Sequence, residues 1–313
     1  MIKLIFSHIY TYLKENLGAL RILPLDENEA LEIGLVLVGE KNEAEVKEVL
    51  NYLSELAIRY EKEGQESDTK RIIEYMREIG KAAAIASLEL IVIITLRLIS
   101  LVAREACRQQ MESALVSIAL SLGEIGKIAA GQKMEAPARI AASCLGKMGN
   151  TPAFTRTKKE TIAVIFALGE IGKSVTRQSL GDVANSTVAL LGETGKIAAS
   201  LNFEDAALNA ELLLQEIGTG AIEKNLKEAA DTSVRSLENI GKTSDKQGLE
   251  KVLLQAAYSL ETIKFNAEDR YLMSASIVAE VALLSFERLE VKELEKNLNR
   301  NSRGRKRFSG TDL

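Results

Sequence analysis

Two short segments of this 313-residue sequence resemble the end of a nucleotide-binding P-loop. They are Gly-Lys-Ser at 172–174 and Gly-Lys-Thr at 241–243. The P-loop also needs a glycine five residues before the Gly-Lys pair and a strand that leads into the loop. Ala167 and Ser236 occupy those glycine positions, and both segments lie within a helical repeat. We therefore predict no phosphate-binding loop at either place.

Metal and redox chemistry lack the necessary side chains. The sequence has one histidine, His8, and two cysteines, Cys107 and Cys144. A structural zinc site needs about four nitrogen or sulfur ligands and a catalytic one about three. The cysteines occupy different positions in the repeat, so we expect buried apolar residues and no disulfide bridge. We predict no metal site, no cofactor site and no catalytic residue, and hence a protein that is not an enzyme.

Carboxylates are the remaining groups that could act in acid–base chemistry, and no pair of them stands out from the repeat. Glu124, Glu170 and Glu216 each begin a recurring Glu-Ile-Gly sequence, and in the first two a lysine follows the glycine. In a stacked array, equivalent residues line up along one edge. We therefore expect a ladder of these three glutamates on one side, with Glu193 on the other. They are candidate partner-binding residues; a solvated helix face is the alternative.

The composition favours a long helical array over other folds. The chain has three prolines and no tryptophan, and 46% of its residues are apolar, although only 4% are aromatic. An average sequence of this length would contain roughly 16 prolines. Few prolines and few aromatic residues are typical of a chain that stays helical throughout.

A repeat of 23 residues organises most of the sequence. Glycines recur in one register at intervals of 23 or 46 residues, and the two missing steps fall on Ala57 and Ala103. The register runs from about residue 20 to about residue 290. The glycines that share the position are Gly34, Gly80, Gly126, Gly149, Gly172, Gly195, Gly218 and Gly241.

Each unit is long enough for one helix of roughly 18 to 20 residues and a short turn. A leucine four residues before the glycine and an isoleucine one residue before it share a helical face, which we assign to the core. Each helix should begin at the acid that follows an apolar residue, as at Met111-Glu112. In an alternative parsing, a short second helix such as 127–130 separates the glycine from the turn. We favour the long helix, with a break or kink at 149–152.

A glycine inside a helix costs about 0.5–1 kcal/mol relative to alanine, so a recurrent one needs an offsetting gain. Close approach of neighbouring helices supplies that gain. Four units carry a second glycine three residues earlier, which widens the small-residue face: Gly123, Gly146, Gly169 and Gly192. We expect these units to pack most tightly, and Gly172→Leu to cost several kcal/mol through overpacking.

The strings Leu-Gly-Glu-Ile-Gly at 122–126 and 168–172, and Leu-Gly-Glu-Thr-Gly at 191–195, resemble the end of the second helix in HEAT-like and armadillo-like repeats. The 23-residue register predicts an all-α solenoid of about 12 antiparallel helices, paired into 46-residue αα hairpins, and the resemblance implies the same α-solenoid architecture. It also implies a scaffold or adaptor role, and it carries over no catalytic residue. The sequence departs from the family in its shorter unit and in lacking the regular proline, aspartate and arginine of that repeat.

Three segments follow from this register: an N-terminal capping helix at 1–22, the solenoid at 23–290, and the end of the last helix with a disordered basic tail at 291–313. The net charge is −4, but residues 26–68 carry −9 and residues 300–313 carry +4. A polar basic tail is typical of a docking arm or a solubilising terminus. The tail's candidate partner-binding residues are Arg300, Arg303, Arg305, Lys306 and Arg307.

These observations favour a cytoplasmic, non-enzymatic scaffold that binds a protein partner on a curved face of stacked helices. The alternative is a peripheral membrane or nucleic-acid adaptor that uses the basic tail and the apolar helix 88–103. That helix is short and flanked by charges, so burial in the solenoid is the simpler interpretation. Weak head-to-tail association between the acidic first units and a neighbour's basic tail would be abolished by salt.

Overall fold

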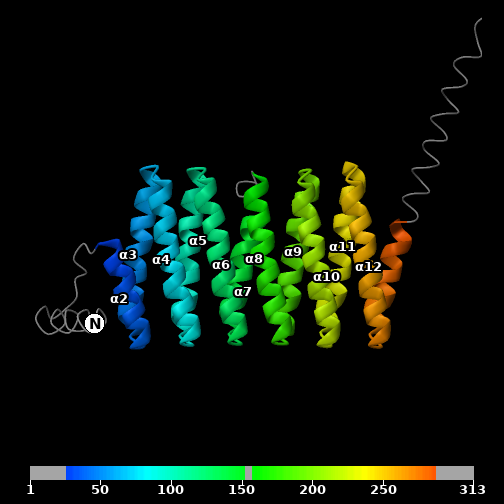
Figure 1. Ribbon diagram of the computed structural model, residues 1–313, viewed down its shortest axis with the longest axis horizontal. Coiled ribbons are helices and arrows are strands. Elements are labelled where there is room, and N and C mark those ends of the chain that lie inside the picture. The colour runs from blue at the N-terminus through cyan, green and yellow to red at the C-terminus, as the bar shows by residue number, and fades with distance from the viewer. Residues whose placement is uncertain (1–25, 152–156, 287–313) are drawn as a thin grey trace, which may run out of the picture.

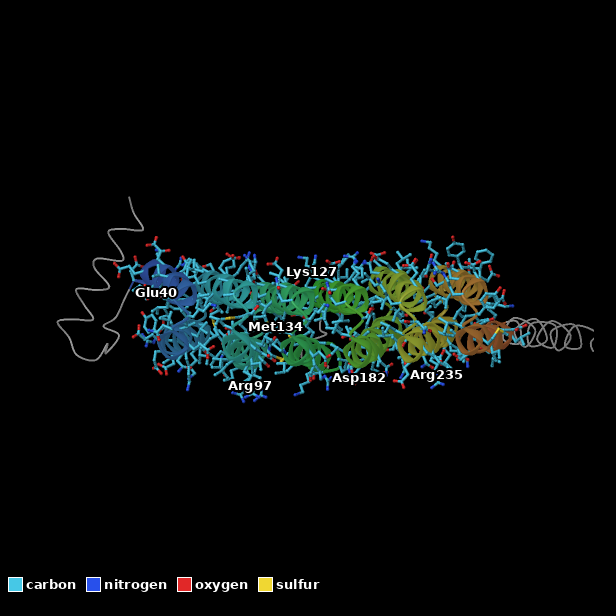
Figure 2. The ribbon with its side chains drawn as sticks, turned by 90° about the horizontal axis from the view of Figure 1, so that it is seen from below. Glu40, Arg97, Lys127, Met134, Asp182 and Arg235 are labelled. Atoms are coloured by element: carbon cyan, nitrogen blue, oxygen red, sulfur yellow. The ribbon has the colours of Figure 1, made fainter. Side chains whose placement is uncertain are left out.

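The protein is an array of antiparallel helices (Figure 1), which lie in two layers (Figure 2). The computed structural model describes residues 26–151 and 157–286, and every regular element in these ranges is a helix. Each helix packs against its neighbours in sequence and against the helix two units away. The helices α2, α4, α6, α8, α10 and α12 form one layer, which we name the even layer; α3, α5, α7, α9, α11 and the last helix form the odd layer.

Most helices have 20 residues and start 23 residues apart, so the single long helix per unit is confirmed. Eight of them begin at a glutamate, as the register predicts. α7 ends at Gly149, which places the expected break, and α8 begins beyond it with a capping box formed by Thr157 and Glu160. The bounds are α2 Glu27–Gly39, α3 Glu43–Lys62, α4 Glu66–Ile85, α5 Glu89–Arg108, α6 Glu112–Gly131, α7 Glu135–Gly149, α8 Lys158–Arg177, α9 Gly181–Ser200, α10 Glu204–Glu223, α11 Lys227–Gln247, α12 Glu250–Asp269 and the last helix Met273–Phe286.

The turns between helices also recur every 23 residues. Between α6 and α7, Lys133 has a φ of +60° and donates its N–H to the carbonyl of Ala130, while the next residue donates to Ala129. This is a Schellman arrangement, which satisfies carbonyls at the helix end. Among the residues that the structure describes, glycine occupies the left-handed position at Gly64 and Gly248. The other described turns place a side-chain-bearing residue there: Lys41, Ser87, Gln110, Lys133, Ser179, Asn202, Asn225 and Tyr271.

We expect Lys133→Gly to raise the free energy of unfolding by about 0.5–1 kcal/mol. A left-handed conformation costs a residue with a Cβ roughly 1–2 kcal/mol, and the added chain entropy of glycine in the unfolded state cancels part of that relief. Urea unfolding followed by circular dichroism measures the change. Lys133→Ala removes the same side chain but keeps the Cβ, so it should give no gain. Equal midpoints for the two variants would contradict this explanation.

The repeat glycines receive a side chain from two units further along the chain. A Cβ built on Gly126 would lie 2.7 Å from Cδ1 of Ile171 and 2.6 Å from Cβ of Ala141. At Gly172 the nearest atom would be Cδ1 of Ile217, at 2.5 Å. The close-packing prediction is therefore confirmed. Most of these glycines form a socket for an isoleucine of the next helix in the same layer, while Gly149 receives Thr194 and Gly241 receives Phe286. Contacts of the same kind surround Gly34, Gly80, Gly149, Gly195, Gly218 and Gly241.

The two layers are nearly straight rows, so the expected curved face is wrong (Figures 1 and 2). Curvature requires a different helix spacing in the two layers. Here the same 23-residue unit builds both, and the same socket sets the spacing in each, as Gly172 with Ile217 does in the even layer and Gly195 with Ile240 in the odd layer. Equal spacing on both sides leaves no reason to bend.

Helix 88–103 corresponds to α5, and most of its apolar side chains lie in the core, including Ile91, Leu96 and Ile99. The simpler interpretation of this helix, burial in the solenoid, is therefore confirmed. By length and composition α6 could cross a membrane, but 67% of its apolar window is buried in the array. It packs between α4 and α8 of the even layer and against α5 and α7 of the odd layer. The predicted capping helix at 1–22, His8 and the basic tail lie outside the described residues.

Candidate functional site

The predicted glutamate ladder is present on the even layer. Glu124, Glu170 and Glu216 lie on α6, α8 and α10, and lysines join them into an alternating row. Lys173 contacts Glu170 of its own helix at 2.6 Å and Glu216 of the next even helix at 3.5 Å. Lys127 bridges to Glu170 at 2.5 Å. Each glutamate therefore faces a cation, and the row is an internal ion-pair network.

Hydrogen bonds from Lys127 and Lys173 lower the pKa of Glu170 below its ordinary value. Glu193 lies on α9 in the odd layer and pairs with Lys196 at 3.3 Å, so the expected separation of the two sides is confirmed. Exposed ion pairs of this type contribute little free energy. The ladder stabilises the layer surface and leaves little unpaired negative charge for a ligand.

A row of exposed apolar side chains lies one helical turn from the ladder. Leu120, Phe166, Leu212 and Tyr258 occupy equivalent positions on α6, α8, α10 and α12, spaced 46 residues apart, and we name them the apolar stripe. Their exposed fractions are 44, 45, 51 and 62%. Leu254 and Phe265 extend the apolar surface on α12. A contiguous exposed apolar patch of several hundred Å² is typical of an interaction site.

The odd layer carries no such row in the part of the chain that the structure describes between α5 and α11. The equivalent positions there hold Arg97, Ser143, Ala189 and Arg235. Figure 2 shows Arg97 and Arg235 pointing away from the array on the odd layer, while Lys127 lies on the opposite side. One repeat therefore produces two outer faces of different chemistry. A continuous apolar row runs from α6 to α12 on the even face, whereas exposed apolar side chains of the odd face lie on separate helices, such as Leu101 on α5 and Val281 on the last helix.

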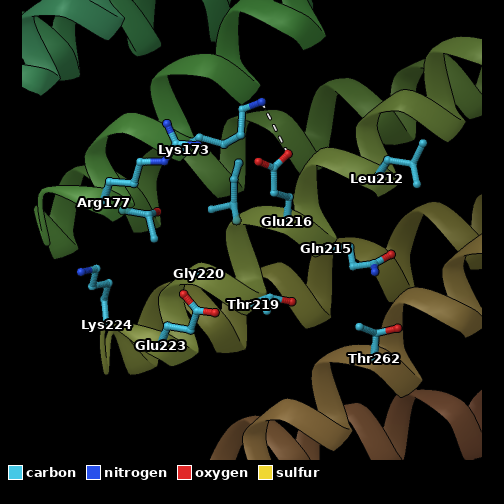
Figure 3. Close-up of a pocket in the computed structure, with 12 residues that line it drawn as sticks. Lys173, Arg177, Leu212, Gln215, Glu216, Thr219, Gly220, Glu223, Lys224 and Thr262 are labelled. Atoms are coloured by element: carbon cyan, nitrogen blue, oxygen red, sulfur yellow. Dashed lines mark ion pairs between the residues drawn. The ribbon is translucent and has the colours of Figure 1, made fainter.

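A surface pocket of about 500 Å³ lies beside the stripe between α8, α10 and α12. Lys173 and Arg177 enter it from α8, and Glu216 and Glu223 enter it from α10 (Figure 3). Its charges are of both signs, and Lys173 is already paired with Glu216. Within residues 26–151 and 157–286, no group of three or more potential ligands could hold a metal ion.

Two carboxylates are buried in the array without a hydrogen-bond partner, namely Glu61 on α3 and Glu211 on α10. Burial raises the pKa of Glu61 to about 8, with a further contribution from the charge of Glu105. Burial alone raises the pKa of Glu211 to about 10. Neither lines the pocket, so we assign them an effect on stability and no chemistry on a ligand.

The ladder was predicted from the sequence, whereas the stripe and the buried Glu211 were not. Both could have been found by comparing equivalent positions more fully. Taking every second unit separates the large apolar residues at positions 120, 166, 212 and 258 from Ser143, Ala189 and Arg235, which lie at the positions between them. The candidate tail residues, Arg300 to Arg307, lie outside the described residues, so the structure does not place them near either feature.

No protein-family model matches the sequence, and no curated protein matches it. A solved structure described as a circular tandem repeat protein with novel repeat topology and enhanced subunit contact surfaces has a similar fold, with a TM-score of 0.54. The two sequences are 12% identical, and the match covers 88% of this chain and 72% of that one. At this identity the similarity shows the fold alone. The chain is an all-α tandem-repeat solenoid.

Proposed function

We propose that this protein is a non-enzymatic interaction scaffold that binds a protein partner on the outer face of the even layer. The apolar stripe carries the proposal, because it is an exposed apolar row that the packing of the array does not require. In the odd layer the same positions of α5, α7, α9 and α11 hold Arg97, Ser143, Ala189 and Arg235, none of which is a large apolar side chain, so the continuous row belongs to the even face. As parts of the same proposal, we propose that the chain is related to HEAT-like or armadillo-like repeat proteins and that it is located in the cytoplasm.

Affinity capture with a charged stripe tests this function. We expect Phe166→Glu with Leu212→Glu to lose the proteins that the wild-type chain retains, since both side chains would place a carboxylate in an apolar contact. Ser143→Glu with Ala189→Glu adds the same charge at equivalent positions of the odd layer and should keep those proteins. Mass spectrometry identifies and quantifies them. Identical partners for both double variants would exclude the even face as the binding surface.

The adaptor that uses the basic tail remains a second proposal, carried by the +4 charge of residues 300–313. Removing these residues separates the two proposals. Loss of binding to anionic liposomes or nucleic acid would favour the tail adaptor, since such contacts depend on cationic side chains. Unchanged protein partners after the truncation would favour the scaffold.

A further inference from the structure

We propose that the partner which fits the apolar stripe is a second copy of this chain, packed face to face through the even layers. This proposal rests on the scaffold proposal, because it uses the same surface, and it goes further by identifying the occupant. Three properties of the face support it: its straightness, its area and its balanced charge.

The straightness of the array makes the stripe self-complementary. A curved face cannot match a copy of itself along its length, whereas two straight rows with the same spacing stay in register. A two-fold axis between α8 and α10 would set α6 of one copy opposite α12 of the other. Leu120 would then face the position of Tyr258, and Phe166 that of Leu212. The position on α4 that would continue the stripe holds Glu74, so a dimer centred on α8 and α10 uses all four apolar helices.

The exposed area approaches what a stable dimer needs. The stripe, together with Leu254 and Phe265, exposes between 44 and 72% of six large apolar side chains. Scaled from the area of fully buried large side chains, this is about 700 Å² per copy, and a stable interface of standard size buries about 800 Å² per partner. The polar side chains at the edges of the stripe would supply the remainder.

The charges on both sides of the stripe are balanced, so a copy meets no large field of its own sign. On one side lies the glutamate ladder with its lysines. On the other side, at the helix N-termini, Lys158 pairs with Asp205, Lys159 with Glu112 and Lys251 with Glu204. In a two-fold dimer, mixed-sign rows meet mixed-sign rows, which avoids the repulsion that would exclude a second copy.

Analytical ultracentrifugation of the full chain at concentrations between about 1 and 100 μM tests the proposal. This concentration range covers ordinary dimer dissociation constants. We expect a dimer for the wild-type chain and for Ser143→Glu with Ala189→Glu. Phe166→Glu with Leu212→Glu should weaken dimerisation by about 100-fold or more, because two central contacts are lost. Circular dichroism and the unfolding midpoint show that each variant is folded. A wild-type chain that stays monomeric throughout, or a stripe variant that still dimerises, would overturn the proposal.

Salt and tail truncation separate this dimer from the charge-driven head-to-tail association. The face-to-face dimer is apolar at its centre, so we expect it to persist in 0.5 M salt and after removal of residues 300–313. Association that disappears under either condition would overturn the face-to-face arrangement. A different result would overturn the scaffold proposal: the wild-type chain and Phe166→Glu with Leu212→Glu would capture the same other proteins in the same amounts. A monomer whose partners depend on the stripe would therefore reject the dimer and keep the scaffold.

Discussion

Replacing Glu211 by leucine should raise the free energy of unfolding by about 3 kcal/mol at pH 7. Glu211 is completely buried on α10, and neither of its carboxylate oxygens has a partner. The equivalent positions of neighbouring units hold Ile165, Val188 and Val234, all completely buried. An apolar side chain therefore fits this site in three neighbouring units. The substitution removes an unpaired polar group from the core and restores the apolar pattern.

The size of this effect should depend on pH. Burial raises the pKa of Glu211 from 4.5 to about 10 in the folded state, so folding at neutral pH requires uptake of a proton. The corresponding stability is fully present below about pH 4.5 and falls as the pH rises, until the folded pKa is reached. Each pH unit in this window corresponds to about 1.4 kcal/mol. The gain from Glu211→Leu should therefore be small at pH 5 and grow steadily to pH 8.

Urea unfolding of the wild-type chain and Glu211→Leu at several pH values measures this trend. Glu211→Gln is a useful second variant, because it removes the titrating group but leaves a polar side chain in the core. Glu216→Gln changes an exposed glutamate on the same helix and should alter the free energy of unfolding by less than about 1 kcal/mol. A gain from Glu211→Leu that is equal at pH 5 and pH 8 would contradict the linkage argument.

The polar environment of Glu211 continues at the contact between α10 and α12. Gln215, one turn further along α10, accepts a hydrogen bond from the hydroxyl of Ser259 on α12 at 2.9 Å. Residues four apart lie on one helical face, so Glu211 also lies on the side of α10 that faces α12. In the contact between α6 and α8, Gly123 and Ala167 lie at the positions of Gln215 and Ser259. The contact between α10 and α12 is therefore the more polar of the two and gains most from an apolar residue.

Features of the fold that depend on interactions within one repeat unit could be predicted from the sequence, whereas features that depend on both layers could not. Helix starts, helix lengths and the packing role of Gly126 depend on the sequence of one unit and on its repetition, and the register predicted them. The glutamate ladder also follows from repetition alone. The straightness of the array does not, because it depends on the spacing in two layers at once. The apolar stripe was hidden for the same reason, since units of both layers alternate along the chain.

Glu211 shows a second limit of prediction from this sequence. A glutamate in a helix is expected to be exposed to solvent, and α10 does contain exposed glutamates, such as Glu216. Only the position within the repeat distinguishes the two. The leucine and isoleucine positions define the register, whereas the pattern at the position seven residues before the glycine emerges only when all units are aligned on that register. At that position the buried Ile165 and Val188 contradict a surface assignment for Glu211.

Gly123→Leu should destabilise the array by about 3 kcal/mol or more, because the obstacle at this glycine is backbone. A Cβ on Gly123 would lie 2.6 Å from Cβ of Ala167 and 2.9 Å from its Cα on α8. At Gly172 the nearest atom is the terminal Cδ1 of Ile217, which can rotate away. Overpacking of a rigid contact costs about 1–3 kcal/mol for small insertions and more for large ones. We expect Gly123→Ala to cost about 1 kcal/mol, since its better helix propensity offsets part of the clash.

Gly131→Ala is the matched control, because Gly131 ends the same helix and a Cβ there would meet nothing closer than Ser174 Oγ, at 4.0 Å. That change should be neutral or stabilising by up to about 1 kcal/mol. The double variant Gly123→Ala with Ala167→Gly moves the methyl group from α8 to α6, and the two changes should offset each other partly in a double-mutant cycle. Urea unfolding measures the wild-type chain, Gly123→Leu, Gly131→Ala, the single variants Gly123→Ala and Ala167→Gly, and the double variant. Equal stability of Gly123→Leu and Gly131→Ala would show that α6 and α8 can separate at little cost, and that the recurring glycines do not hold the layer together.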